Sequence, residues 1–236
     1  MFPCFLSFIL QPLSFILPKI VPLLKFDLEI IKRSSPAYLI GVDEAGRGPL
    51  AGPVTAAAAF IPPAAYPFLT EVNDSKQLSE KKRVALLARM RAAGVRFGFG
   101  FATPREIDEL NILGATFKAM AQAANRLLAS LGAGPCEALV LVDGPHRIKN
   151  ISLKQEAIVG GDGKSLSIAA ASIFAKVVRD RWMEELDRRR PGYGFAVHKG
   201  YGTRAHMAAL TALGPCAEHR RSFAPVRNAL NTEACL

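Results

Sequence analysis

Four acidic residues stand where apolar segments end, and they are the residues of this sequence best suited to chemistry. They are Asp43, Glu44, Asp143 and Asp162. A carboxylate at the end of a buried segment is costly unless it is paired or bound to a cation. Hard cations such as Mg²⁺ prefer oxygen ligands. Two such ions roughly 3.5–4 Å apart can activate water and stabilise the leaving oxygen of a phosphodiester. The acids therefore predict a two-metal hydrolytic site.

Each acid alone has a simpler interpretation. Asp162 is typical of a turn or of a helix N-cap, and the pair Asp43 and Glu44 is typical of a surface. The whole set favours metal binding, because the chain is basic and glycines nearby allow a close backbone approach. The sequence does not establish that the four carboxylates meet in space.

Three further segments could contact a polyanion. The turn Gly46-Arg47-Gly48 would expose backbone N–H groups beside a phosphate-binding guanidinium. Lys76 lies in a turn before a helix, and residues 193–201 interleave aromatic and basic side chains around glycines. The alternatives are an ordinary surface turn, a packed aromatic loop with Phe195 in the core, and a solvated basic cluster at His219-Arg220-Arg221.

The spacing of residues argues against two other kinds of site. Gly163-Lys164-Ser165 resembles the end of a phosphate-binding P-loop, but Ile158 stands where that motif requires glycine. The cysteines form no C-x-x-C pair, so we expect them to be reduced and expect no structural zinc. They are Cys4, Cys136, Cys216 and Cys235.

The elements that position the acids follow from apolar periodicity. Strands are expected at 38–42, 54–61, 94–102, 138–142 and 156–159, and helices at 80–93, 103–131, 165–189 and 203–213. This mixture predicts an α/β or α+β fold with helices packed on a sheet. Two of the acids would then lie at strand ends, where ligands bind in such sheets.

The first 35 residues are expected to stand apart from the fold. Residues 1–31 are apolar but interrupted by Pro3, Pro12, Pro18 and Pro22, which fits neither a membrane-spanning helix nor a signal peptide. We expect a poorly ordered extension or an over-extended translation start, with a membrane anchor as the alternative. The remaining chain has no internal repeat or linker. The net charge of the whole sequence, +10, favours polyanionic partners.

Six segments in succession resemble the signatures of bacterial ribonuclease HII. They are GVDEAGRGPLAGPV (41–54), NDSKQLSEKKR (73–83), LVDG (141–144), GGDGKS with SIAAASIFAKVVRD (160–180), YGFAVHKGY (193–201) and HRRSF (219–223). The resemblance implies an α/β ribonuclease H-like fold, with a central mixed five-stranded sheet flanked by helices and a helical C-terminal part. It implies a catalytic domain over residues 36–230, an N-terminal extension over 1–35 and a tail over 231–236.

The same resemblance implies the roles of individual residues. Asp43, Glu44, Asp143 and Asp162 would bind Mn²⁺ or Mg²⁺ and be catalytic. Gly46, Arg47 and Gly48 would sense the ribose 2′-hydroxyl, Tyr201 would stack on the next deoxyribose, and Lys76 would assist with a phosphate.

Activity and setting are implied in the same way. The substrates would be RNA–DNA hybrids and DNA containing ribonucleotides, cut on the 5′ side of a ribonucleotide to leave 3′-hydroxyl and 5′-phosphate ends. The protein would be a cytoplasmic monomer that is not attached to a membrane.

One departure concerns the aromatic loop. The family usually has proline after the tyrosine of HKGY, and Gly202 stands there in this sequence, which predicts a looser loop around Tyr201. Two other functions stay open: a non-catalytic protein that binds RNA–DNA hybrids, and another nuclease of this fold that acts on DNA.

Overall fold

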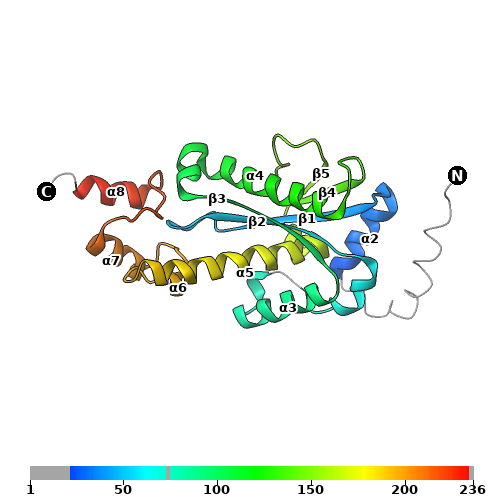
Figure 1. Ribbon diagram of the computed structural model, residues 1–236, viewed down its shortest axis with the longest axis horizontal. Helices are drawn as coiled ribbons and strands as arrows, with labels where there is room; N and C mark the ends of the chain where they lie inside the picture. The colour runs from blue at the N-terminus through cyan, green and yellow to red at the C-terminus, as the bar shows by residue number, and fades with distance from the viewer. Residues whose placement is uncertain (1–21, 73–74, 234–236) are drawn as a thin grey trace.

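The structure is a computed structural model that describes residues 22–72 and 75–233 and shows a mixed sheet between layers of helices (Figure 1). The strands are β1 Tyr38–Ala45, β2 Val54–Phe60, β3 Arg96–Ala102, β4 Ala138–Asp143 and β5 Lys154–Ile158. Their order in the sheet is β3-β2-β1-β4-β5. β2 pairs antiparallel with β1 and β3, whereas β4 pairs parallel with β1 and β5. The five-stranded mixed sheet is confirmed.

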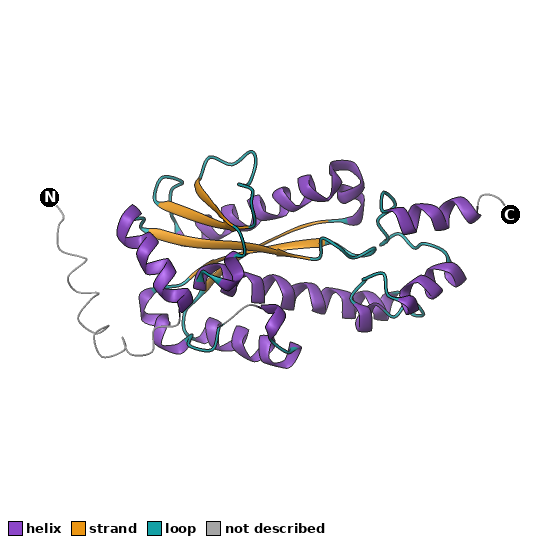
Figure 2. Cartoon of the chain, turned by 180° about the vertical axis from the view of Figure 1, so that it is seen from behind, coloured by secondary structure: helices purple, strands orange, loops and turns teal. Residues whose placement is uncertain are grey.

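Helices cover both faces of this sheet (Figures 1 and 2). Helix α4 Pro104–Leu131 lies on one face, and α5 Leu166–Arg189 lies on the other with α3 Glu80–Ala92 packed beside it. Beyond one end of the sheet the chain continues as α6 Phe195–His198, α7 Arg204–Leu213 and α8 Ala224–Glu233, so the helical C-terminal part is confirmed. The remaining elements are the helix α2 Pro22–Ser34 and the short 3₁₀ helices η3 Pro63–Phe68, η4 Ser75–Gln77 and η5 Gly161–Gly163.

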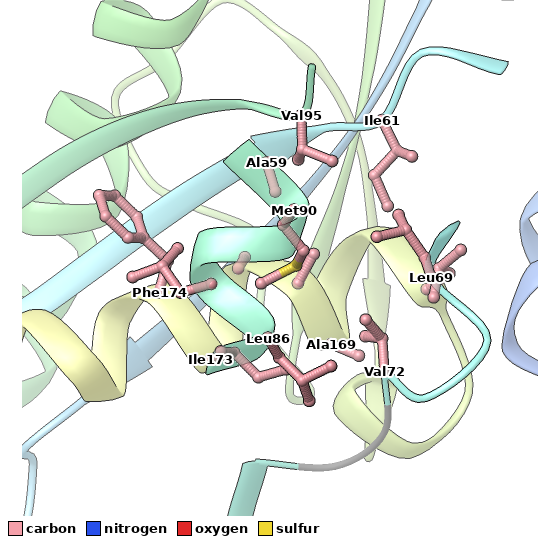
Figure 3. Close-up of a cluster of buried hydrophobic side chains, with 14 of the residues drawn as sticks. Ala59, Ile61, Leu69, Val72, Leu86, Met90, Val95, Ala169, Ile173 and Phe174 are labelled. Carbon is pink, nitrogen blue, oxygen red and sulfur yellow. The ribbon is translucent and has the colours of Figure 1, made fainter. Parts of the chain in front are cut away.

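Each face of the sheet buries its own apolar core. Between the sheet, α3 and α5, the side chains of Met90, Ile173 and Phe174 pack together (Figure 3). Gly41 lets α5 approach β1 closely, because a Cβ atom there would lie 2.1 Å from the backbone carbon of Ser167. This contact seats the first turn of α5, and the loop that precedes it, directly against the strand that carries Asp43.

Helix starts follow local capping signals. Ser79 caps α3 by accepting a hydrogen bond from the backbone N–H of Lys82. Thr103 and Glu106 form a capping box at the start of α4, with Pro104 in the first helical position. The predicted helices and strands are therefore found, with boundaries that differ from the expected ones by at most three residues, the largest difference being the end of β1 at Ala45.

The expectation of a poorly ordered extension over residues 1–35 is wrong for residues 22–34. They form α2, whose buried residues include Leu23, Leu24 and Ile30. Pro22 is the first residue of this helix, where the missing N–H costs nothing, so it starts the helix rather than breaking it. Residues 1–21, with Cys4, lie outside the described residues, as do Asn73, Asp74 and residues 234–236 with Cys235.

Within the described ranges, no helix combines the length and apolar character that a membrane crossing requires. Cys136 and Cys216 are both free thiols. The expected tail over 231–236 begins inside α8.

Asp27 joins α2 to the start of α5. Its Oδ2 accepts a hydrogen bond of 2.8 Å from the backbone N–H of Ser167, in the first turn of α5. A carboxylate there is favoured by the helix dipole. Burial is the larger effect, and it raises the pKa of Asp27 to about 6 from an ordinary 3.8.

This shift predicts a pH-dependent contribution of Asp27 to stability. Between about pH 4 and 6 the folded protein binds a proton here that the unfolded chain releases, so stability falls as pH rises through that window. The unfolding free energy of the wild type, relative to Asp27→Asn, should decrease between pH 4 and 7 by on the order of 1–3 kcal/mol. Urea unfolding of both proteins at several pH values measures this difference, and a constant difference would contradict it.

Candidate active site

Two neighbouring parallel strands bring two of the predicted acids together. β1 pairs with β4 so that Val42 lies opposite Val142, which places Asp43 and Asp143 side by side at the carboxyl ends of these strands. The third acid, Asp162, lies in η5, between β5 and α5. One carboxylate oxygen from each of the three lies within 4.8 Å of the others. The structure therefore brings together three of the four predicted acids.

Glu44 is not part of this group and approaches from the other face of the sheet. Successive residues of a strand point to opposite faces, so Glu44 faces the α4 side, where it lines a small hollow with Arg47 and Asp143. Arg47 Nη1 lies 3.3 Å from Glu44 Oε1. Burial raises the pKa of Glu44, the positive charge of Arg47 opposes that shift and the negative charge of Asp143 reinforces it. Glu44 thus interacts electrostatically with the cluster while lying outside its inner group.

The charged forms of Asp43 and Asp143 are disfavoured by burial and by neighbouring carboxylates. Burial raises the pKa of Asp43 well above its usual range, and the charges of Glu44 and Asp143 add to the shift. Burial also raises the pKa of Asp143, reinforced by Asp162. A divalent cation would remove this repulsion, and an all-carboxylate set is what Mg²⁺ or Mn²⁺ prefers. The residues present therefore fit such an ion.

Hydrogen bonds hold the carboxylates in place. The backbone N–H of Gly161 donates to Asp143 Oδ1 at 2.6 Å, and that of Glu44 donates to Asp43 Oδ1 at 2.7 Å. Lys76 Nζ lies 2.8 Å from Asp162 Oδ2. Lys76, which was predicted to assist with a phosphate, thus lies at the site, and most of its side chain is exposed to solvent.

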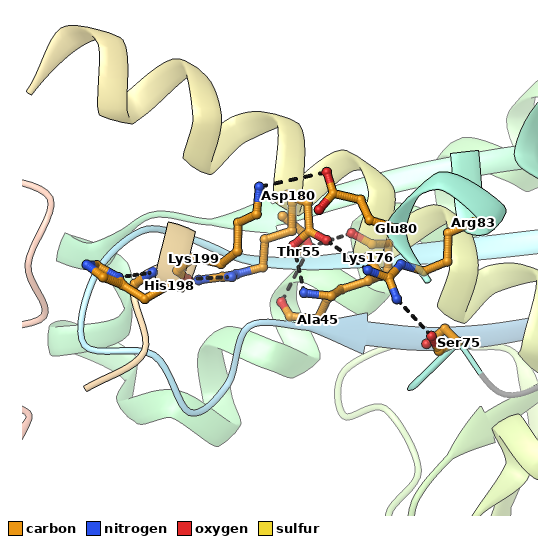
Figure 4. Close-up of polar contacts among 12 residues, drawn as sticks. Ala45, Thr55, Ser75, Glu80, Arg83, Lys176, Asp180, His198 and Lys199 are labelled. Carbon is orange, nitrogen blue, oxygen red and sulfur yellow. Dashed lines mark hydrogen bonds and ion pairs between the residues drawn. The ribbon is translucent and has the colours of Figure 1, made fainter. Parts of the chain in front are cut away.

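A buried network that was not predicted holds the segment that contains Lys76, and Figure 4 shows its residues Ser75, Arg83 and Asp180. Arg83 of α3 donates to the carbonyl oxygens of Ser75 and Leu78 at 3.0 and 2.5 Å. The same guanidinium lies 3.5 Å from Asp180 of α5, which also pairs with Lys176 at 2.7 Å. These contacts tie the segment around Lys76 to α5, the helix that follows the Asp162 loop.

Arg220 orients the turn at residues 46–48. It was expected to belong to an exposed basic cluster, but its side chain is fully buried and it donates to the carbonyl oxygens of Gly46 and Arg47 at 2.5 and 2.8 Å. A trans peptide directs its N–H away from its carbonyl. The N–H groups of Arg47 and Gly48 therefore point away from Arg220, and neither donates a hydrogen bond within the residues that the structure describes.

Tyr201 lies beside this turn. Its side chain is 47% exposed, and a Cβ atom built on Gly48 would lie 3.7 Å from its ring. The backbone N–H of Leu50 donates to the carbonyl of Gly200 at 2.8 Å, which joins the two loops. The turn and the tyrosine therefore form one continuous surface. Phe195 is buried, as expected for a core residue of the aromatic loop.

Comparison with known proteins places the chain in a family. The family model for ribonuclease HII matches residues 40–226. Ribonuclease HII of Geobacillus thermodenitrificans is 51% identical over 83% of this chain and 72% of its own length. Ribonuclease HII of Geotalea uraniireducens is 48% identical over 89% of this chain and 93% of its own length.

Solved structures share the fold. Ribonuclease H2 from Pyrococcus horikoshii aligns with a TM-score of 0.63 at 25% identity, over 83% of this chain and 98% of that one. Bst-RNase HIII in complex with Mn²⁺ aligns with a TM-score of 0.64 at 20% identity, over 84% and 71% of the two chains. Because the family model covers most of its length and its relatives are about half identical to it, this chain belongs to the ribonuclease HII family.

Proposed function

We propose that this chain cuts the RNA strand of RNA–DNA hybrids, and cuts DNA on the 5′ side of embedded ribonucleotides, by two-metal hydrolysis that leaves 3′-hydroxyl and 5′-phosphate ends. Ribonuclease H activity on RNA–DNA hybrids follows from membership of the family. The observation that carries the proposal of two-metal hydrolysis is the convergence of Asp43, Asp143 and Asp162 at one edge of the sheet.

The carboxylates hold the divalent ions in this proposal. Asp43, Asp143 and Asp162 supply oxygen ligands from one side, and Glu44 supplies the fourth carboxylate from the α4 side. Bound Mn²⁺ or Mg²⁺ would lower the pKa of a coordinated water and stabilise the charge on the leaving 3′ oxygen. Lys76 would exchange its ion pair with Asp162 for a substrate phosphate, and the exposure of its side chain supports this role.

The turn at residues 46–48 would recognise the sugar rather than the base. The outward N–H groups of Arg47 and Gly48 can donate to a ribose 2′-hydroxyl, which is the group that distinguishes RNA from DNA. Arg47 can exchange its contact with Glu44 for a backbone phosphate. The exposed ring of Tyr201 would stack on the deoxyribose of the next nucleotide. Specificity would then be for a ribonucleotide followed by DNA, regardless of sequence.

The cellular setting is a further part of the proposal. A net charge of +10 suits a duplex substrate held through its phosphates. We propose a cytoplasmic monomer. A related structure is described as a complex of PCNA with ribonuclease HII from Archaeoglobus fulgidus. A clamp of that kind is therefore a partner worth testing.

Cleavage of a DNA duplex with one ribonucleotide tests the activity. In Mn²⁺ or Mg²⁺ we expect a single cut 5′ to the ribonucleotide, no cut in EDTA, and a rate on the order of a thousandfold lower for Asp43→Asn. Asp43→Asn also removes a buried carboxylate whose charge is unfavourable, so without metal this variant should be at least as stable as the wild type. A folded wild type that binds hybrids without cutting would favour the non-catalytic alternative, and cutting of all-DNA duplex would favour the DNA nuclease.

Two glycines of the turn form a matched pair for testing its rigidity. Gly46 has φ +94°, and a Cβ atom there would lie 1.9 Å from Nε of Arg179. That guanidinium is buried and cannot retreat, because it donates to the carbonyls of Ala51, Pro53 and Lys199. Gly46→Ala should therefore lower the unfolding free energy by about 1–3 kcal/mol.

Gly48→Ala is the control, because its added Cβ would meet only the Tyr201 ring at ordinary contact distance. We expect its stability to stay within about 0.5 kcal/mol of the wild type. Urea unfolding midpoints of the two variants give the comparison. Equal stabilities would mean that Arg179 does not constrain the turn.

A further inference from the structure

Three histidines lie together behind the loop that carries Tyr201. His206 and His219 are fully buried, and His198 stacks on His206 with ring centroids 4.4 Å apart and planes 12° apart. The rings of Tyr193 and Phe195 pack against them. None of the three belongs to the acidic cluster. A buried imidazole is costly unless its ring nitrogens are satisfied, so the partners of these nitrogens are informative.

The partners assign the proton positions along two of these rings. The backbone N–H of Cys216 donates to Nδ1 of His219 at 3.1 Å, so that nitrogen is an acceptor and the proton of His219 is on Nε2. His219 Nε2 lies 3.1 Å from Nε2 of His206, which must then accept. The proton of His206 is therefore on Nδ1, where it donates to the carbonyl oxygen of Tyr201 at 2.9 Å.

The resulting chain of hydrogen bonds has a single direction. It begins at a backbone N–H that can only donate, passes through two neutral imidazoles and ends at a backbone carbonyl that can only accept. Burial lowers the pKa of His206, and lowers the pKa of His219 to about 4, so both rings are neutral near pH 7. Reversing either tautomer would leave two donors or two acceptors facing each other in a buried contact.

The third histidine fixes the other side of the same loop. His198 Nδ1 accepts from the backbone N–H of Gly200 at 3.2 Å, and its Nε2 donates to the carbonyl of Tyr193 at 2.7 Å. The backbone N–H of Tyr201 donates to the carbonyl of His198 at 2.9 Å. Tyr201 is thus held at both its N–H and its carbonyl, although the next residue, Gly202, lacks the rigidity of a proline.

We propose that His219 and His206 are positioning residues for Tyr201. Their directed hydrogen bonds, together with that from the backbone N–H of Thr203 at 2.8 Å, fix the carbonyl of Tyr201, and so aim its exposed ring at the sugar that follows the ribonucleotide. The inference rests on the proposed function of Tyr201 and deepens it. It assigns recognition of the RNA–DNA junction to side chains that never touch the substrate.

A double-mutant cycle separates this role from general stability. The measured quantity is junction selectivity, which we define as kcat/KM on a duplex with one ribonucleotide divided by kcat/KM on a continuous RNA–DNA hybrid. The variant is the pair His206→Phe with His219→Phe, which removes both polar rings and leaves an apolar cluster. We expect it to lower junction selectivity by about tenfold, the equivalent of roughly one lost hydrogen bond.

The cycle repeats this pair in a Tyr201→Ala background. There the pair should have no further effect on selectivity, because the residue through which it acts is gone. His206→Gln is the conservative control. Its amide can accept from His219 and donate to the Tyr201 carbonyl, so it should retain more selectivity than the Phe pair.

Two results would overturn the inference. One is an unchanged junction selectivity in a folded Phe pair, and the other is the same loss with and without Tyr201. A wild type that cuts neither duplex would instead overturn the proposed function.

The ¹⁵N shifts of the imidazoles test the hydrogen-bond order independently of activity. They must report Nδ1–H for His206 and Nε2–H for His219 near pH 7. Any other tautomer for either ring would rule out the directed chain.

Discussion

The parallel pairing of β1 with β4 puts Asp43 beside Asp143, and the burial of these carboxylates, reinforced by repulsion from neighbouring acids, is the constraint on which the site depends. The sheet is stable enough to hold them together because its two faces are buried by α4 and α5. The N-terminal turn of α5 packs tightly on β1 at Gly41, which places the Asp162 loop against the same edge. The fold therefore holds the carboxylates where their charge is unfavourable, and a divalent cation would relieve this repulsion.

The surface that would contact substrate is supported by buried cations whose partners are backbone carbonyls. Arg220 holds the turn at residues 46–48, and Arg179 holds the carbonyls of residues 51, 53 and 199. Burial lowers the pKa of Arg179 to about 10 and that of Arg220 to about 9. Each guanidinium is removed from water and instead donates hydrogen bonds to three backbone carbonyl oxygens. The turn is thereby rigid although it is rich in glycine.

Much of this arrangement was predictable from the sequence because its signals are local. Apolar runs that end in Asp43 and Asp143 predicted strands whose ends carry acids, and those strands are neighbours in the sheet. The alternation of side chains along a strand could also have predicted that Glu44 faces away from Asp43.

Other features depend on tertiary contacts. From the sequence alone, Pro22 is equally compatible with breaking a helix and with starting one. The packing of α2 against α5 determines that it starts a helix. Arg220 and His219 read as a solvated basic cluster because their partners, in the segment 46–52 and on α7, are distant in the sequence.

Calorimetric titration of Mn²⁺ near pH 6, in two buffers of different ionisation enthalpy, tests the central claim most directly. Because burial and mutual repulsion raise the pKa values of Asp43 and Asp143, the account predicts saturable binding that releases protons. It also predicts tighter binding as pH rises, and a large loss of affinity in Asp143→Asn. Binding that releases no protons, or equal affinity in the wild type and Asp143→Asn, would contradict a metal site built on these strand-end carboxylates.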